Sequence, residues 1–197
     1  MGFGKRKKYM LQTYGNESLK KVSEKVTVFD RELNELANSM TRAMHELNGI
    51  GLAAVQIGVH KRLVIIDVPQ SSMSTPPTPG ELQLLPQMPI ALVNPEIIEK
   101  GSEIVSYDEG GLSVPDLYAP VDRPRLIKVR AWDLTGQSFE FECGGLLARC
   151  IQHEVDHLDG FLFVDRLSEE EGIAVAGELE AVKRRGRKFN YQRDIKA

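Results

Sequence analysis

The chain of 197 residues is long enough for one domain with its own hydrophobic core and too short for two large ones. Its 42% hydrophobic and 27% charged residues are ordinary for a soluble protein, and a formal net charge of -3 indicates no class of partner. No apolar run reaches the ~18 residues of a membrane span, and no apolar core follows the basic start as in a secretion signal. Two cysteines form no disulfide framework, so we expect a cytoplasmic protein. We also expect a monomer with one domain over residues 1–197 and no membrane contact.

In chain order, the first strong pattern predicts an amphipathic helix over residues 30–49. Apolar side chains recur there at three- and four-residue steps, Asp30 is a suitable N-cap, and Gly49 is a suitable end. The segment GIGLAAVQIG that follows indicates a glycine-rich turn. The β-branched run of residues 62–68 predicts a buried strand.

Residues 69–89 contain six prolines, so we expect a surface loop without regular structure. Beyond this loop the sequence predicts strands at 90–94, 126–132 and 138–143, then helices at about 145–158 and 169–183. Because the strands gather in the middle and show no strict βαβ alternation, the expected fold class is α+β.

His153, Glu154 and His157 form an H-E-x-x-H pattern within the second predicted helix. Four residues correspond to about 400° of helical rotation, so the two imidazoles lie about 40° apart on one face. Both can bind one metal ion, and Glu154 stands beside them to take a proton from water. The pattern predicts a metal-dependent hydrolase.

The third metal ligand decides which kind of hydrolase this is. A metalloprotease would take a glutamate roughly twenty residues further on, and Glu178 is available. A metzincin would need His or Asp where Phe163 stands, which excludes that class.

Three segments together resemble the peptide deformylase family. Its motifs G-x-G-x-A-A-x-Q, E-G-C-L-S and Q-H-E-x-D-H-L correspond, in that order, to residues 49–56, 109–113 and 152–158, and the likeness extends from about residue 11 to 167. The second motif departs from the family at one position. The family has a cysteine there, the third metal ligand, and this chain has Gly111.

The resemblance implies small antiparallel sheets packed around a central helix that carries H-E-x-x-H, with helices at the N- and C-terminal ends. The implied activity is removal of the N-formyl group from formyl-methionyl nascent peptides. His153 and His157 would hold the metal, usually Fe²⁺ with Zn²⁺ and Ni²⁺ as alternatives, and Glu154 would transfer the proton. The Gln56 side chain and the Leu112 backbone N–H would stabilise the oxyanion.

Further roles follow from the same resemblance. The backbones of Ile50, Gly51 and Gly110 would pair with the substrate, and an apolar pocket for the methionine side chain would involve Ile50, Leu146 and Cys150. Supporting the metal ligands would be Glu109 and a pair formed by Asp156 with Arg123.

Gly111 makes metal occupancy doubtful and predicts impaired hydrolysis, because two neutral imidazoles remain as ligands. Cys150 lies one turn before His153, but the axial offset of about 10 Å between positions 150 and 157 is long for a cysteine side chain, which favours a pocket wall. Two alternatives stay open. One is a weak or inactive deformylase-like peptide-binding protein, and the other is a metalloprotease that uses Glu178.

A basic tail begins at about residue 182. Residues 182–193 include six basic and two aromatic side chains and no acidic one. Basic residues that neutralise phosphates release counterions, so this pattern suits a polyanion, although a solvated chain end explains it equally well. Because the family is thought to dock on the ribosome through this end, the resemblance implies a contact with the ribosome surface.

Overall fold

A computed structural model of the protein describes residues 9–188. The strands in this range are β1 (Gly51–Ala53), β2 (Leu63–Ile66), β3 (Ile90–Lys100), β4 (Ile104–Gly111), β5 (Val114–Pro124), β6 (Ile127–Trp132) and β7 (Ser138–Cys143). The α-helices are α1 (Arg31–Glu46), α2 (Pro79–Leu84), α3 (Gly145–Leu158) and α4 (Glu169–Lys188).

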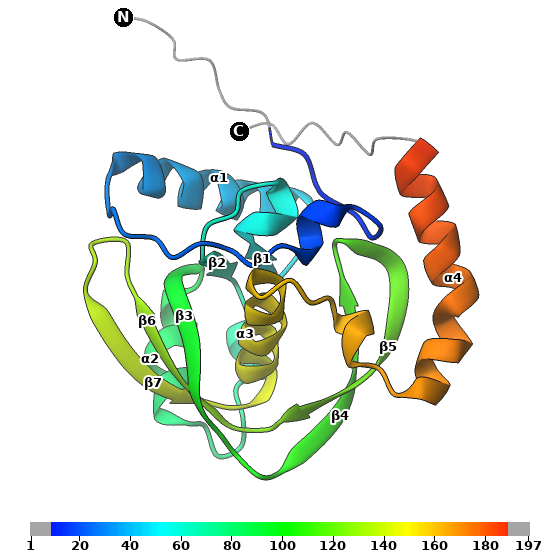
Figure 1. Ribbon diagram of the computed structural model, residues 1–197. Coiled ribbons are helices and arrows are strands. Elements are labelled where there is room, and N and C mark those ends of the chain that lie inside the picture. Colours follow the sequence, from blue (N-terminus) through cyan, green and yellow to red (C-terminus); the bar gives the residue numbers. More distant parts are fainter. Residues whose placement is uncertain (1–8, 189–197) are drawn as a thin grey trace, which may run out of the picture.

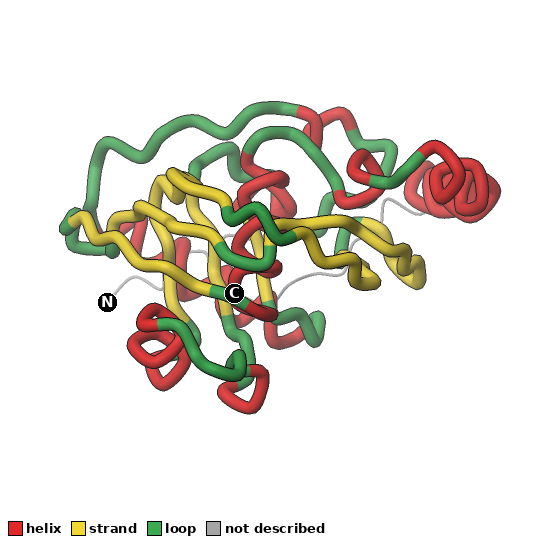
Figure 2. Tube along the Cα trace, turned by 90° about the horizontal axis from the view of Figure 1, so that it is seen from below, coloured by secondary structure: helices red, strands yellow, loops and turns green. Residues whose placement is uncertain are grey.

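The strands form two antiparallel sheets. Five strands follow the order β1-β2-β3-β6-β7, while β4 and β5 pair as a separate hairpin. Helix α3 lies between the sheets and contacts β1 and β2 on one side and β5 on the other (Figure 1). Seen from below, the strands curve around this central helix, and α4 stands at one edge (Figure 2). The expected α+β class and the central helix are confirmed.

Helix α1 begins and ends close to the predicted residues. The Asp30 carboxylate accepts a hydrogen bond from the Leu33 N–H at 3.0 Å, which satisfies one of the free donors at the helix start. Its apolar face, which includes Met40 and Met44, is buried and packs near β2. The chain leaves the helix at Gly49, whose N–H donates to the Met44 carbonyl at 2.9 Å.

Helix α3 lies at the centre of the fold and is buried on almost every side. One face carries Ile151, Val155 and Leu158, which belong to the core between α3 and the five-stranded sheet. Much of the remaining surface of the helix carries polar side chains that are nevertheless buried, including Gln152, Glu154 and His157. A helix that buries both an apolar and a charged face positions functional groups inside the protein.

The prediction of an irregular loop over residues 69–89 is wrong in part, because α2 lies within it. Thr78 and Glu81 form a capping box, and Pro79 occupies the first turn, where its missing N–H costs nothing. Glu81 is fully buried, and its carboxylate also accepts the Ser74 N–H at 2.7 Å and the Thr78 N–H at 2.9 Å. These bonds satisfy backbone N–H groups in a segment where the prolines prevent regular strand pairing.

Strands β1, β4 and β5 were not predicted, and β3 extends to Lys100 instead of ending at residue 94. Helix α4 extends to Lys188, so the expected tail from residue 182 begins as helix, with Val182 buried. Residues 189–197 of that tail lie outside the described range. Within residues 9–188, none of the helices combines the length and apolarity that crossing a bilayer requires.

Replacing Glu81 by alanine should lower the free energy of unfolding by about 2 kcal/mol or more, because the buried N–H groups of Ser74 and Thr78 lose their acceptor. Chemical denaturation measures this change. Gln83 is exposed on the same helix, so Gln83→Ala is the matched control and should stay within about 0.5 kcal/mol of wild type. Equal effects of the two substitutions would contradict the role given to Glu81.

Candidate active site

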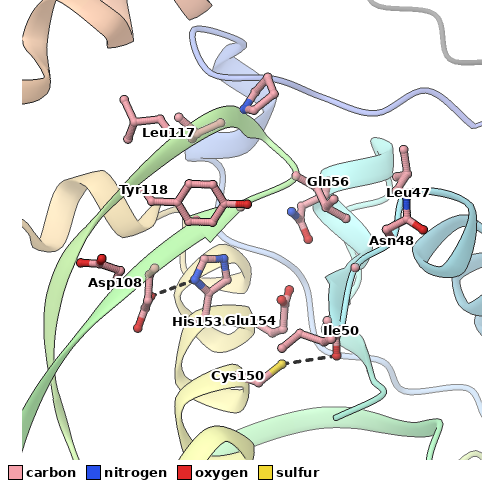
Figure 3. A pocket seen from close by; sticks show the side chains of 18 of the residues that line it. Leu47, Asn48, Ile50, Gln56, Asp108, Leu117, Tyr118, Cys150, His153 and Glu154 are labelled. Carbon is pink, nitrogen blue, oxygen red and sulfur yellow. Dashed lines mark hydrogen bonds and ion pairs between the residues drawn. The ribbon is translucent and has the colours of Figure 1, made fainter. Parts of the chain in front are cut away.

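A cavity of about 620 Å³ opens between α3 and the edges of β1 and β4 (Figure 3). It brings together most of the residues that the sequence singled out, namely Ile50, Gly51, Gln56, Glu109, Gly110, Leu112, Leu146, Cys150, His153 and Glu154. Gly111 lies on the same wall. His157, Arg123 and Asp156 lie behind this lining and contact it from within the core.

The two histidines of α3 converge. The Nε2 atoms of His153 and His157 are 3.2 Å apart, and Glu154 faces the same space as His153 (Figure 3). Two imidazole nitrogens that share one metal at about 2.1 Å each would lie about 3.4 Å apart in a tetrahedral arrangement. The spacing on the helix therefore brings the two nitrogens close enough to share one ion.

Glu109 fixes the orientation of His153. Its Oε2 lies 3.0 Å from the His153 Nδ1, so Nδ1 carries the donated proton and Nε2 keeps its lone pair. Burial alone would raise the pKa of Glu109, but hydrogen bonds from His153 and Arg123 lower that pKa to about 2. The same bond raises the pKa of His153 although burial of the ring opposes it. Burial and the neighbouring His153 hold the pKa of His157 well below its usual value.

A buried ion network supports Glu109. Arg123 donates from Nε and Nη2 to the two Glu109 oxygens at 2.7 and 2.9 Å, and from Nη1 to Asp156 at 2.8 Å. Arg149 adds a bond from Nη1 to the Glu109 Oε1 at 2.7 Å, and Arg166 donates to Asp156 from the other side. The pairing of Asp156 with Arg123 is as expected, and it ties α3 to the β4–β5 hairpin.

Glu154 is buried beside the histidines, and its Oε2 has no hydrogen-bond partner among the described residues. Burial and the charge of Glu109 raise the pKa of Glu154 to about 7, against the opposing effect of His153. A carboxyl group with this pKa exchanges a proton readily near neutral pH, which suits a general acid–base. Burying a carboxylate oxygen without a hydrogen-bond partner costs stability, so its presence here indicates a functional role.

Gly111 differs from Gly51 and Gly110 in the space that its surroundings leave for a side chain. A Cβ at Gly51 would collide with the buried Glu154 and lie 2.8 Å from the Cys150 sulfur, and one at Gly110 would collide with the exposed Tyr118 ring, so a side chain at either position requires a neighbour to move. A Cβ at Gly111 would instead lie 3.3 Å from the His153 Nε2, a tight contact that a small shift of the ring relieves, and its φ lies outside the left-handed region. A side chain fits there, and it would point at the histidine pair.

The residues present fit a metal incompletely. His153 and His157 offer two converging nitrogens, and the His157 Nδ1 is a buried atom without a partner in the described part of the chain. Among residues 9–188, no group of three or more His, Cys, Asp or Glu side chains is placed to hold an ion. The position that a third side chain would occupy belongs to Gly111.

The Gln56 amide is held in one orientation. Its Oε1 accepts the Ala53 N–H at 2.8 Å, and its Nε2 donates to the Ser113 hydroxyl at 3.2 Å. An amide nitrogen carries two hydrogens, so one remains available for a group in the cavity. Leu112, between Gly111 and Ser113, lines the same cavity.

Cys150 points away from the histidine pair. Its sulfur lies 3.5 Å from the Ile50 carbonyl oxygen, and burial raises the pKa of its thiol well above the usual value. A buried thiol held against the Ile50 carbonyl lines the wall of the pocket, the role that the sequence analysis favoured for it. Leu146 and Ile50 line the same part of the cavity.

Glu178 is not brought to the site. It is exposed on α4, which packs against β5, and it does not line the cavity. The metalloprotease alternative lacks the contact on which it depends.

Arg149, Arg166 and Tyr107 were not identified from the sequence. Arg149 bridges α3 to β4 through Glu109 and the Val105 carbonyl, and its guanidinium carbon lies 5.6 Å from the centre of the Tyr107 ring. One signal was available for Arg149, which precedes His153 by four residues and therefore shares its helix face. Arg166 and Tyr107 lie outside the three motifs and offered no comparable signal.

The comparisons with known proteins agree with this geometry. The family model described as polypeptide deformylase matches residues 8–172. A peptide deformylase of Cellvibrio japonicus is 42% identical over 162 residues, covering 82% of this chain and 88% of the relative. One of Rhodopseudomonas palustris is 40% identical over 174 residues, covering 88% and 94%.

Solved structures lead to the same family. The crystal structure of peptide deformylase from Ehrlichia chaffeensis in complex with actinonin has a TM-score of 0.78 at 34% identity and covers 91% of this chain and 98% of its own. Arabidopsis thaliana peptide deformylase 1B, in complex with an inhibitor, has the same TM-score at 34% identity, covering 92% and 94%. This chain therefore belongs to the polypeptide deformylase family of hydrolases.

Proposed function

We propose that this protein hydrolyses the N-formyl group of formyl-methionyl nascent peptides in the cytoplasm, with an activity limited by the missing side chain at position 111. The observation that carries the proposal is the buried Glu154, whose Oε2 has no partner within residues 9–188, beside two converging histidine nitrogens in a cavity of about 620 Å³. That combination supports an acid–base role for Glu154 in metal-dependent hydrolysis.

The proton transfers belong to Glu154. As water attacks the formyl carbon, the carboxylate accepts the proton from water and then gives it to the departing amine, so formate leaves and a free N-terminus remains. The raised pKa of Glu154, about 7, suits both halves of this exchange. A bound divalent metal, Fe²⁺ by family resemblance with Zn²⁺ and Ni²⁺ as alternatives, would be held by His153 and His157 and would supply Lewis-acid polarisation.

The oxyanion would receive hydrogen bonds from the Gln56 Nε2 and the Leu112 backbone N–H. Gln56 is already oriented by Ala53 and Ser113, so it needs no reorganisation when charge develops. The peptide would lie extended between two strand edges, pairing with the backbones of Ile50, Gly51 and Gly110. Its methionine side chain would enter the cavity between Ile50, Leu146 and Cys150.

A second candidate function is favoured by Gly111. With two histidine donors and no third, a chain that keeps the groove would still bind formylated or other short peptides without turning them over. Formate release from a formyl-Met peptide separates the two functions, because a binding protein retains the peptide unchanged.

The wild-type protein should carry well under one metal ion per chain after desalting, and the Gly111→Cys variant close to one. The geometry at position 111 directs a side chain toward the His153 Nε2, so a thiolate there completes the donor set. Formate release should rise at least ~100-fold in the variant, since loss of a ligand matters at least as much as loss of a group that supports one. Equal metal content and equal rates would contradict the role given to position 111.

In the Gly111→Cys background, Glu154→Gln should abolish formate release and leave the metal content unchanged, because Glu154 transfers protons and does not bind the metal. Glu178→Gln is the matched control. It removes the same charge from an exposed helix position and should alter neither quantity. Loss of metal in the Glu154 variant would show that this residue is a ligand, and loss of activity in the Glu178 variant would revive the metalloprotease alternative.

We also propose that the basic C-terminal segment supplies affinity for ribosomal RNA. Within the described range, Arg184 and Arg185 are exposed on α4, and their nearest carboxylates, those of Glu180 and Asp116, lie 3.9 and 3.7 Å away, which indicates weak pairing. Both guanidinium groups are therefore available for phosphates. The remaining basic residues of the segment, beyond position 188, lie outside the described residues.

Replacing Arg184 and Arg185 by glutamine should weaken ribosome binding and reduce the slope of log affinity against log salt by about two, as for two lost phosphate contacts. Sedimentation with ribosomes over a salt series measures both quantities. The control replaces the exposed Lys25 and Arg31 by glutamine, which changes the net charge equally on another part of the surface. The same loss in both variants would indicate a net-charge effect with no specific role for α4.

A further inference from the structure

We propose that Arg149 sets the side-chain specificity of the cavity, so that the pocket for the first residue of a formylated peptide takes methionine sulfoxide about as well as methionine. This inference rests on the peptide-binding role of the cavity in the function proposed above, and it adds a second class of substrate for the same site. That class is a formylated chain whose first residue has been oxidised. The oxidised side chain is polar and carries a hydrogen-bond acceptor in place of the apolar thioether.

The wall of this pocket is not purely apolar. Positions 146, 149, 150 and 153 of α3 have the spacing of one helix face, and all four line the cavity. Arg149 therefore stands beside Leu146 and Cys150, two of the residues expected around the methionine side chain. Its side chain is 12% exposed, so the guanidinium group belongs to the wall of the cavity and not to the outer surface.

Arg149 keeps hydrogen-bond donors in reserve. Its Nη1 donates to the Glu109 Oε1 at 2.7 Å and to the Val121 carbonyl at 2.9 Å, and its Nη2 donates to the Val105 carbonyl at 2.6 Å. A guanidinium group carries five N–H hydrogens, so the Nε–H and the second Nη2 hydrogen have no partner among the described residues. The Nε atom is not one of the fully buried atoms that lack a partner, so it is accessible to a ligand.

The charges around Arg149 favour a neutral acceptor. Glu109 already pairs with Arg149 at 2.7 Å, and Glu154 lines the same cavity. A carboxylate side chain on the peptide would add a negative charge close to both, whereas a sulfoxide oxygen accepts an N–H bond without a net charge. The Tyr107 ring, whose centre lies 5.6 Å from the guanidinium carbon, shields part of the group from competing water.

An apolar pocket would discriminate against the oxidised side chain. Moving a polar group from water into surroundings without a hydrogen-bond partner weakens binding by roughly tenfold or more. A bond from Arg149 offsets that loss, because a charged donor makes a stronger bond than a neutral one. The affinities for methionine and for its sulfoxide should therefore agree within about threefold.

The test measures the binding of formyl tripeptides to the full-length wild-type protein by calorimetry. The peptides share their second and third residues and begin with methionine, methionine sulfoxide or norleucine, the last being an apolar side chain of the same length without an acceptor. Formate is assayed after each titration, so that turnover of a peptide is recognised. Sulfoxide and methionine peptides of similar affinity are the expected result. A sulfoxide peptide that binds at least about tenfold more weakly than the other two would overturn the inference.

Two variants separate the donor role of Arg149 from its structural role. Arg149→Met removes the N–H groups at similar length, so the sulfoxide peptide should become at least about tenfold weaker relative to the methionine peptide. Arg166→Met is the matched control, because Arg166 joins the same ion network through Asp156 and does not line the cavity. It should leave the ratio of the two affinities as in the wild type. A general disturbance of the network weakens all peptides alike, so an unchanged ratio in Arg149→Met would contradict the donor role.

The outcomes also distinguish this inference from the proposed function. If the methionine and norleucine peptides bind but the sulfoxide peptide does not, the inference fails and the proposed function stands. If the ratios behave as expected but Gly111→Cys releases no formate from either methionine peptide, the role of Arg149 stands and the hydrolytic function fails. If none of the peptides binds, both fail.

Discussion

The active-site geometry depends on one buried ion pair, between Arg123 on β5 and Glu109 on β4. Both side chains are about 5% exposed, and the pair is bidentate, at 2.7 and 2.9 Å. Through Glu109 it sets the orientation of His153, and through Asp156 it attaches α3 to the hairpin. Because a buried pair contributes little net stability, its value here is positional, and breaking it would leave an uncompensated charge in the core.

The elements that the sequence predicted well are those with one dominant local signal. Helix α3 and strand β7 have the predicted residues, because an uninterrupted helical period and an alternating strand pattern have no local competitor. The β4–β5 hairpin was missed for a physical reason. Most of β4 is exposed, so it lacks alternation, and β5 contains Pro115, Pro120 and Pro124, which are tolerated because β5 pairs with one neighbour.

The residues of the site also divide into those with a local sequence signal and those without one. The positions of His153, Glu154 and His157 come from helix geometry alone, and their convergence required no tertiary information. The network behind them did require it. Arg123, Arg149 and Arg166 reach two carboxylates from three different elements, and a side chain that acts across the fold leaves little trace in the local pattern. The resemblance supplied Arg123, while the other two arginines emerged from the structure.

What the chain retains around Gly111 bears on its function. A protein that merely held peptides would need the groove, but it would gain nothing from a buried carboxyl group without a partner for its Oε2, or from an ion network that orients one imidazole nitrogen. Both features cost stability, and both suit the metal-dependent proton transfer that we propose. Gly51 and Gly110 keep the close contacts that their positions demand, whereas nothing in the backbone demands glycine at position 111. Among the described residues, the chain thus keeps the support for a third donor and lacks the donor itself.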